Sequence, residues 1–188
     1  MTEFSKVLYM DADILPIRPL SAVFDNPISF NKDGHPYLFA AAYDSAWVRD
    51  FGKYSRQMPE LGPDDTTASD AFNAGMFLIH PTQQQAAYVK SIYDNPIDGV
   101  DFTNGMEQDL LRYAYRDGGD YPWMRLSQMY NTQWPRLADL NVSHAVHDKM
   151  WKEDSPVHWD LRRYWYVAWG EMIGWASVRE EMDRGVYN

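Results

Sequence analysis

The order of apolar and polar positions predicts short strands that alternate with helices. Residues 7–10 form a continuous apolar run inside a strand predicted over residues 6–11. Such a run is typical of a strand that is buried on both faces, as in a parallel sheet. The same kind of pattern predicts four more strands, over residues 37–43, 75–80, 126–130 and 142–147. Strands that alternate with helices favour an α/β domain.

Three helices are predicted from capping signals and helical spacing. Thr82 and Gln85 have the spacing of a capping box, which predicts a helix that begins there and continues to about Tyr93. A second helix is predicted over residues 105–117, because two glycines follow it. Residues 160–184 carry aromatic and aliphatic side chains at helical spacing and form the third predicted helix.

The length of the chain, 188 residues, is that of one domain. We expect residues 1–188 to form a single domain. Residues 45–69 are polar and rich in proline, glycine and acidic residues, so we expect a surface insertion there. No apolar run reaches the roughly 18–20 residues that a membrane span requires, so no membrane segment is predicted in this chain.

Composition excludes several classes of function. The chain has no cysteine, which excludes disulfides, thiolate metal sites and cysteine nucleophiles. Its net charge is −10, so it repels polyanions at long range and nucleic acid is not expected as a partner. Aromatic residues make up 15% of the chain, which fits an aromatic core or stacking surfaces for a flat ligand such as a sugar or a base.

Two aspartates follow the first predicted strand. Asp11 and Asp13 are two positions apart, and such residues point to the same face of a strand. Two adjacent carboxylates repel each other unless a cation lies between them, and oxygen ligands suit Mg²⁺ or Mn²⁺. A solvated turn after the strand is the alternative interpretation.

The stretch KVLYMDADILPIRPL resembles the metal-binding segment of glycosyltransferase family 8, the glycogenin-like enzymes. A second segment, DAFNAGMF, resembles the stretch that lines the donor-sugar pocket in that family, and the motif AAYD resembles one whose aspartate reaches the sugar. The resemblance therefore implies sugar-side roles for a set of residues: Asp44, Asp70, Asn73, Ala74 and Gly75.

Two further blocks occur in the order of the family. The block GMEQDLL resembles a helix start beside the reacting sugar, which implies roles for Glu107 and Gln108, with Asn104 just before them. In the block HAVHDKMW, the resemblance implies a third metal ligand, a lysine on the donor phosphates and a tryptophan nearby. Lys149 and Trp151 match the last two, whereas His144 and His147 both remain candidates for the ligand.

The resemblance implies a GT-A-like nucleotide-diphospho-sugar transferase fold, with a mixed, mostly parallel sheet flanked by helices. It implies a retaining transferase that uses Mn²⁺ or Mg²⁺, a UDP-sugar donor and a carbohydrate or protein acceptor. Glu107, Gln108 and Asp70 are the candidate catalytic groups. The sequence does not distinguish the Golgi lumen from the cytoplasm.

Most of the nucleotide-binding half of the family pattern has no counterpart before the metal motif. We therefore expect an open flank beside the strand over residues 6–11, and self-association through that flank, because unpaired strand edges favour association.

Two other functions remain open from the sequence. A haloacid-dehalogenase-type phosphohydrolase also begins with an apolar strand and an Asp-x-Asp motif, with Asp64 and Asp65 as later metal ligands. Ile14 stands where such enzymes usually have threonine. The second alternative is a truncated, non-catalytic binding or scaffold domain.

Overall fold

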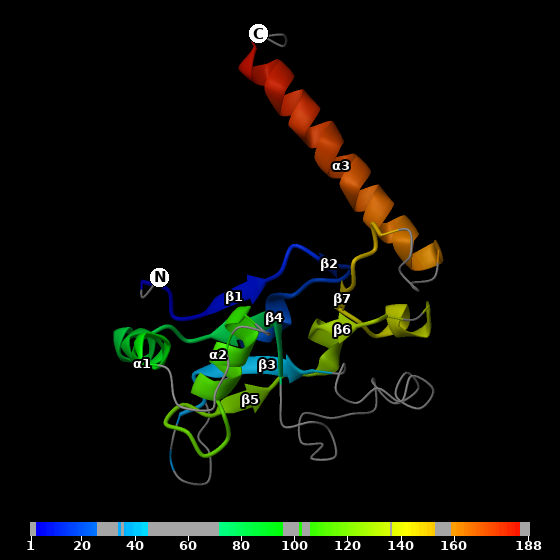
Figure 1. Ribbon diagram of the computed structural model, residues 1–188. Coiled ribbons are helices and arrows are strands. Elements are labelled where there is room, and N and C mark those ends of the chain that lie inside the picture. The colour runs from blue at the N-terminus through cyan, green and yellow to red at the C-terminus, as the bar shows by residue number, and fades with distance from the viewer. Residues whose placement is uncertain are drawn as a thin grey trace.

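The computed structural model describes residues 3–25, 34, 36–44, 72–95, 102, 106–135, 137–152 and 159–184. The insertion predicted over residues 45–69 lies outside these residues. The described chain forms two small sheets, two helices packed on the larger sheet, and a long helix that extends away from both sheets (Figure 1).

The larger sheet has four strands in the order β1-β4-β3-β5. These strands are β1 (Val7–Met10), β3 (Phe39–Tyr43), β4 (Phe72–Ile79) and β5 (Trp123–Arg125). Strand β4 runs antiparallel to both of its neighbours, β1 and β3, whereas β3 and β5 are parallel. β4 begins three residues earlier than predicted, so Asn73 and Ala74 belong to the strand.

The smaller sheet brings Asp13 and His147 together, although they are far apart in the sequence. It contains β2 (Ile14–Pro16), β6 (Thr132–Gln133) and β7 (Ala145–His147), with β7 in the middle. β2 and β7 are antiparallel, and Ile14 is paired with His147. Because Asp13 immediately precedes Ile14, this register places Asp13 beside His147.

The expected mixed sheet flanked by helices is confirmed, but parallel pairs are the minority among the described strands. Three of the five pairings are antiparallel and two are parallel. The expectation of a mostly parallel sheet came from the apolar run in β1. Tyr9 in that run is 42% exposed, and β4 is the one described strand that pairs with β1. The run belongs to a half-buried edge strand of the described sheet.

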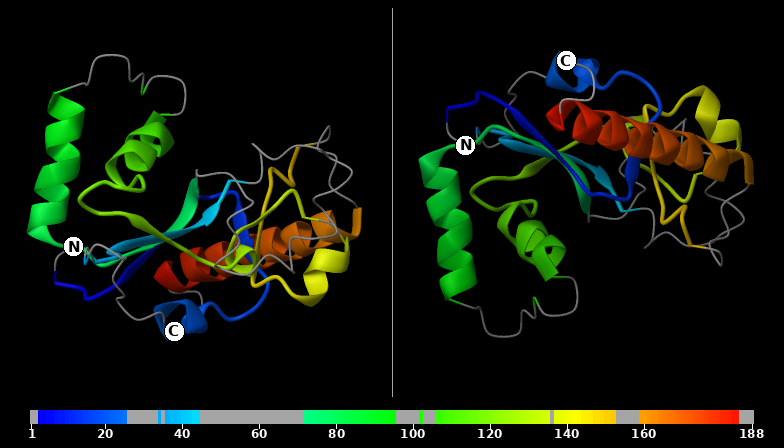
Figure 2. Two further views of the ribbon diagram at one scale, coloured as in Figure 1. Left: turned by 90° about the horizontal axis from the view of Figure 1, so that it is seen from below. Right: turned by 90° about the horizontal axis from the view of Figure 1, so that it is seen from above.

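Helices α1 (Gln83–Asp94) and α2 (Met106–Ala114) pack on the larger sheet. The predicted start of α1 is confirmed, since Thr82 is the N-cap and its hydroxyl accepts a hydrogen bond from the Gln85 amide at 3.0 Å. Such a cap satisfies one of the amides that a helix start leaves without a partner. In Figure 2, both helices lie together on one side of the strands, away from the third helix.

Helix α3 (Trp159–Asp183) is the helix that was predicted over residues 160–184. Its first turns pack on the smaller sheet through Leu161 and Trp165, and its far end points away from both sheets (Figure 1). None of the helices in the described part of the chain combines the length and the apolar character that a membrane crossing needs.

Two short segments differ from the predicted pattern. Residues 128–130, predicted as part of a strand, form a 3-10 helix capped by the Ser127 side chain, and the strand β5 comes just before it. β2 and β6 were not predicted, because strands of two or three residues are too short to show an alternation. Pro16 ends β2, which is an edge strand where a missing amide hydrogen is tolerated.

An aromatic cluster forms the core between the larger sheet and the two packed helices. The ring of Phe39 is fully buried and stacks on Tyr115 with a centroid distance of 4.2 Å. It also contacts Phe77 at 4.8 Å and Phe72 at 4.9 Å. Aromatic pairs of this kind add to the free energy of burial, so Phe39 contributes strongly to the stability of the sheet.

We expect Phe39→Ala to lower the free energy of unfolding by about 3–5 kcal/mol, because a buried ring is replaced by a cavity. Chemical denaturation monitored by circular dichroism measures the effect. Tyr93→Ala, which truncates an exposed ring on α1, is the matched control and should change stability by less than about 0.5 kcal/mol. A loss below about 1 kcal/mol for Phe39→Ala would contradict the packing described here.

Candidate metal centre

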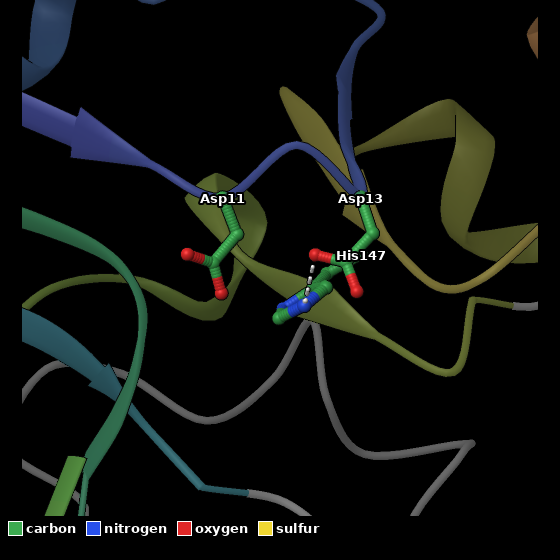
Figure 3. A group of neighbouring side chains, drawn as sticks. All are labelled: Asp11, Asp13 and His147. Atoms are coloured by element: carbon green, nitrogen blue, oxygen red, sulfur yellow. Dashed lines mark ion pairs between the residues drawn. The ribbon is translucent and has the colours of Figure 1, made fainter. Parts of the chain in front are cut away.

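Asp11, Asp13 and His147 converge at the junction of the two sheets. Each can offer one ligand atom, and the three atoms lie within 4.8 Å of one another. Asp11 directly follows β1, Asp13 directly precedes β2, and His147 ends β7. Both carboxylates and the imidazole ring point into the same space (Figure 3). The arrangement offers two oxygen ligands and one nitrogen ligand.

A turn, and not a continuous strand, brings the two carboxylates together. The amide of Asp11 donates to the carbonyl oxygen of Gly75 at 2.7 Å, which keeps the end of β1 attached to β4. The amide of Ile14 then donates to the carbonyl oxygen of Asp11 at 3.1 Å, closing the turn. The two aspartates therefore lie on one side as their spacing predicted, but through a turn after the strand and not through the alternation of a continuous strand.

Gly75 leaves the space that the cluster occupies. A Cβ atom at this position would lie 2.4 Å from Cε1 of His147 and 3.1 Å from an Asp11 carboxylate oxygen. Both distances are shorter than ordinary van der Waals contacts, so a larger residue here would displace the imidazole ring. The site requires glycine at this point of β4 because the backbone approaches two of the candidate ligands closely.

A chain of hydrogen bonds fixes the tautomer of His147. The amide of Gly75 donates to Oδ1 of Asn73 at 3.0 Å, and the amide nitrogen of the Asn131 side chain donates to the same oxygen at 2.9 Å. Oδ1 of Asn131 is therefore the atom that faces Nδ1 of His147, at 2.9 Å. Because an amide oxygen only accepts, Nδ1 carries the hydrogen and donates it.

In the neutral ring, this tautomer leaves Nε2 without a hydrogen, and the lone pair of Nε2 faces the aspartates. Nε2 lies 3.2 Å from Oδ1 of Asp13, so two acceptors are in contact unless a cation lies between them. A proton on Nε2 or a divalent metal ion satisfies this requirement. An imidazole nitrogen with two carboxylates suits Mn²⁺ better than Mg²⁺, which prefers an all-oxygen shell, and the Asn131 contact is the kind of support that orients a metal-binding histidine.

The cluster perturbs the acid–base properties of its members. Hydrogen bonding to His147, aided by Lys149, holds the pKa of the Asp13 carboxyl well below its usual range, although partial burial opposes the shift. The Lys149 ammonium lies 3.0 Å from Oδ2 of Asp13. The Tyr9 hydroxyl donates to Asp11 at 2.8 Å, and this bond, with burial and the charges of nearby acids that include Glu107, raises the Tyr9 pKa.

The sugar-side candidates on α2 and β4 are joined by hydrogen bonds. Oε1 of Gln108 accepts a hydrogen bond from the Ala74 amide at 2.8 Å, which attaches the start of α2 to the middle of β4. Glu107 is exposed in the first turn of the same helix. Asp44 is buried and forms an ion pair with Arg112, whose Nε also donates to the Phe72 carbonyl at 2.8 Å.

Of the two candidate histidines, His144 lies apart from the aspartates. Its Nδ1 is 2.8 Å from the carbonyl oxygen of Pro19, and its ring packs on Tyr130. His147 is thus the histidine that the structure places in the cluster. Asp70 and Asn104 lie outside the described residues, as do Asp64 and Asp65, so the structure gives no position for these four candidates.

A pocket of about 510 Å³ adjoins the cluster on the side of α3, and Asp13 lines both. Three indole rings contribute to its wall, those of Trp151, Trp165 and Trp169. Trp165 and Trp169 stack with their ring centroids 5.4 Å apart. This places Trp151, a sequence candidate, beside the metal centre and not within it.

Sequence reasoning missed three residues that support the site: Tyr9, Arg112 and Asn131. Tyr9 could have been found, because it lies in β1, two positions before Asp11. Arg112 and Asn131 carry no local signal, since their partners Asp44 and His147 are distant in the sequence.

We expect Asn131→Ala to weaken Mn²⁺ binding by about 10- to 100-fold, because the imidazole of His147 loses the partner that sets its tautomer and orientation. Isothermal titration calorimetry on the folded protein measures the affinity. Asn141→Ala removes an exposed asparagine from a nearby 3-10 helix and should leave the affinity unchanged. Equal Mn²⁺ affinity in the Asn131 variant and the parent would contradict the role of the hydrogen-bond chain.

The lowered pKa of Asp13 predicts a pH-dependent contribution to stability. Its ionised form favours the folded state, so the contribution is present above about pH 4, where an unfolded aspartate is ionised, and is lost as the pH falls through the lower folded-state pKa. We expect Asp13→Asn to be less stable than the parent at pH 6 in chelator-treated buffer, and the difference to diminish below about pH 4.

Urea unfolding across that pH range measures the difference in stability. Asp25→Asn, at an exposed aspartate, is the control and should show no such pH-dependent gap. A gap between Asp13→Asn and the parent that grows on acidification would mean that the sign of the Asp13 effect is wrong.

Comparison with known sequences supports the resemblance seen in the motifs. The sequence profile of glycosyl transferase family 8 matches residues 1–159. An uncharacterized protein of Schizosaccharomyces pombe is 30% identical over 195 residues, and a second one is 28% identical over 210 residues. The chain spans about half the length of these relatives, since the matches cover 52% of each. Glycogenin of Cryptococcus neoformans is 29% identical in an alignment of 138 residues that covers 68% of this chain and 12% of that protein.

Comparison of folds finds glycosyltransferases among the similar solved structures. The apo form of the glycosyltransferase GlyE of Streptococcus pneumoniae TIGR4 superposes with a TM-score of 0.56 at 20% identity, covering 94% of this chain and 44% of that one. The galactosyltransferase LgtC, solved with donor and acceptor sugar analogs, gives a TM-score of 0.52 at 18% identity, covering 90% and 63%. These likenesses establish the GT-A type of fold, and the profile match establishes that the chain belongs to glycosyltransferase family 8.

Proposed function

We propose that the protein transfers a hexose-type sugar from a UDP-sugar to a carbohydrate or protein acceptor, with retention of anomeric configuration and with Mn²⁺ as the preferred metal. The observation that supports this most is the convergence of Asp11, Asp13 and His147 in a member of glycosyltransferase family 8. Nε2 of His147 and the carboxylates of Asp11 and Asp13 form a site for a cation, and a diphosphate can approach the cation there.

The residues of the cluster hold the cation and receive the diphosphate end of the donor. Bound there, a divalent metal supplies Lewis-acid stabilisation of the negative charge on the leaving UDP. Lys149 adds a second positive charge at the same place, because its ammonium lies 3.0 Å from Asp13 and its side chain is about half exposed. Asn131 keeps the ring of His147 oriented while the donor binds.

On the sugar side, we assign donor contacts to the segment of β4 and to the start of α2. Asn73, Ala74 and Gly75 lie at the edge of the cluster, and Gln108 is held against Ala74. Glu107, Gln108 and Asp70 are the candidates for the group that stabilises the reacting sugar. Asp44 and Asn104 complete this set of proposed donor contacts.

We assign the acceptor to the pocket between α3 and the turn that carries Asp13. Its indole walls suit the apolar face of a sugar ring, because CH groups of the ring pack well on aromatic faces. Since Asp13 borders both the pocket and the cluster, an acceptor there lies beside the donor diphosphate.

A non-catalytic scaffold is the second candidate function. The observation in its favour is that, among the described strands, β4 alone pairs with β1, so the other edge of β1 has no described partner strand. Self-association through this flank remains part of the proposal. The phosphohydrolase alternative is disfavoured, because the family match covers the Asp-x-Asp segment.

We expect UDP together with Mn²⁺ to raise the melting temperature more than inorganic phosphate with Mn²⁺ does, because the cluster and Lys149 together accommodate a diphosphate. Differential scanning fluorimetry measures the shift. Asp11→Asn should abolish the difference between UDP and phosphate, since it removes one ligand, whereas Asp117→Asn, at an exposed turn, should retain it.

The reaction is then tested without knowledge of the acceptor. UDP-glucose and UDP-galactose are incubated with Mn²⁺, and NMR follows the slow release of sugar to water and its initial anomer, which is α for retention. Binding of Mn²⁺ without any effect of UDP would favour the scaffold. Turnover of p-nitrophenyl phosphate that is lost in Asp11→Asn would favour the hydrolase.

A further inference from the structure

Helix α3 exposes an unusual amount of apolar surface. Beyond its first turns, large side chains such as Val167, Ile173 and Trp175 are open to solvent, the last with 74% of its surface exposed. The helix has 25 residues, so it is about 37 Å long, and it extends away from the sheets (Figure 1). Exposed apolar surface of this extent marks an interaction site.

One stripe of the helix has the pattern of a helix–helix contact. Its residues follow steps of three and four positions, which keeps them on one face of a helix: Arg163, Tyr166, Gly170, Ile173, Ser177 and Glu180. Tyr166 and Ile173 are both exposed, so the centre of the stripe is apolar. The pocket beside Asp13 lies on another face, the one that carries Trp165, Ala168, Trp169 and Met172.

The ends of the stripe carry opposite charges. Arg163 is exposed near the start of the helix, and Glu180 is exposed near its end. These two residues lie equally far from the midpoint of the stripe, which falls between residues 171 and 172. When two copies of the helix pair in opposite directions about that midpoint, Arg163 of each copy lies beside Glu180 of the other.

At the centre of the stripe, a large side chain of one copy lies opposite a glycine of the other. In the antiparallel alignment, Ile173 of one copy faces Gly170 of the other. A Cβ atom built on Gly170 meets nothing within 4 Å, so this position is open on the described surface. Glycine is a poor helix former, and its place here leaves room for a large side chain of a second helix.

From these observations we infer that α3 is a homodimer interface, in which two copies of the chain pair antiparallel through the stripe of Arg163, Tyr166, Gly170, Ile173, Ser177 and Glu180. The arrangement is isologous, since each residue contacts the residue that contacts it in return, as a two-fold axis requires. This inference does not depend on the proposed function, and the interface is separate from the β1 edge.

A second copy fits the stripe better than a membrane surface does. The helix ends in acidic residues, Glu180, Glu181 and Asp183, and the whole chain has a net charge of −10, so an anionic lipid surface would repel it. The opposed charges at the two ends instead attract each other when the same helix is reversed against itself, where Arg163 of one copy joins the Arg184 that already lies 3.9 Å from Glu180 in the other.

Charge exchange on the full chain tests the interface. Sedimentation equilibrium over a concentration series should show a dimer for the parent protein. Arg163→Glu and Glu180→Arg should each raise the dissociation constant about tenfold, because two attractive pairs become repulsive in each dimer. An equimolar mixture of the two variants should recover dimers. In a mixed dimer, each introduced charge faces an opposite charge on the other chain, and the two variants repel only their own kind.

Two further variants control for effects on folding. Glu171→Arg reverses a charge on a different face of the same helix and should leave dimerisation unchanged. Gly170→Leu should increase helix content, because leucine is the better helix former, and should nevertheless weaken the dimer by filling the space for Ile173.

A parent protein that is monomeric at every concentration overturns the inference. Dimers that tolerate both charge reversals and Gly170→Leu overturn it as well, and they would place self-association at another surface such as the β1 edge. Failure of the mixture to recover dimers after both single reversals weaken them would exclude the antiparallel alignment.

Discussion

The backbone of Gly75 connects the two sheets through contacts that no other residue type could maintain. Its carbonyl oxygen receives the amide of Asp11 and so fixes the end of β1. Its amide begins the hydrogen-bond chain through Asn73 and Asn131 that sets the tautomer of His147. Its missing side chain leaves the space in which the imidazole lies. The position and the protonation of the candidate ligands thus both depend on one point of β4.

The electrostatics of the site follow from this geometry. A protein with net charge −10 places two of its carboxylates together, which would be unfavourable without compensation. The Lys149 ammonium compensates Asp13, as does His147 when its Nε2 carries a proton, and the Tyr9 hydroxyl donates to Asp11. The acidic cluster is therefore balanced by groups that remain able to exchange their partner for a cation or a diphosphate.

Short sequence patterns predicted the parts of the fold that depend on contacts between residues close together in the chain. The cap at Thr82, the helix that follows it and the adjacency of Asp11 and Asp13 could all be inferred from spacings of two or three residues. The choice between His144 and His147 could not, because it depends on the pairing of Ile14 with His147 across the smaller sheet. Asn131 was missed for the same reason: its partners, Asn73 and His147, lie far from it in the sequence. The parallel sheet was over-predicted because an apolar run alone does not distinguish a central strand from a half-buried edge.

The candidate ligands also join segments of the chain that are far apart. Asp13 and Lys149, which are in contact, are separated by 136 positions, and His147, the other partner of Asp13, ends the last described strand. A ligand bound by Asp11, Asp13 and His147 therefore cross-links segments that are far apart in the sequence. A ligand that binds the folded chain alone stabilises it by about 2.7 kcal/mol at a concentration one hundred times its dissociation constant. With a divalent cation in the cluster, as in the proposed function, the attachment of the smaller sheet to the larger one would be linked to the supply of that cation. The resistance of this junction to local opening and proteolysis would then depend on it as well.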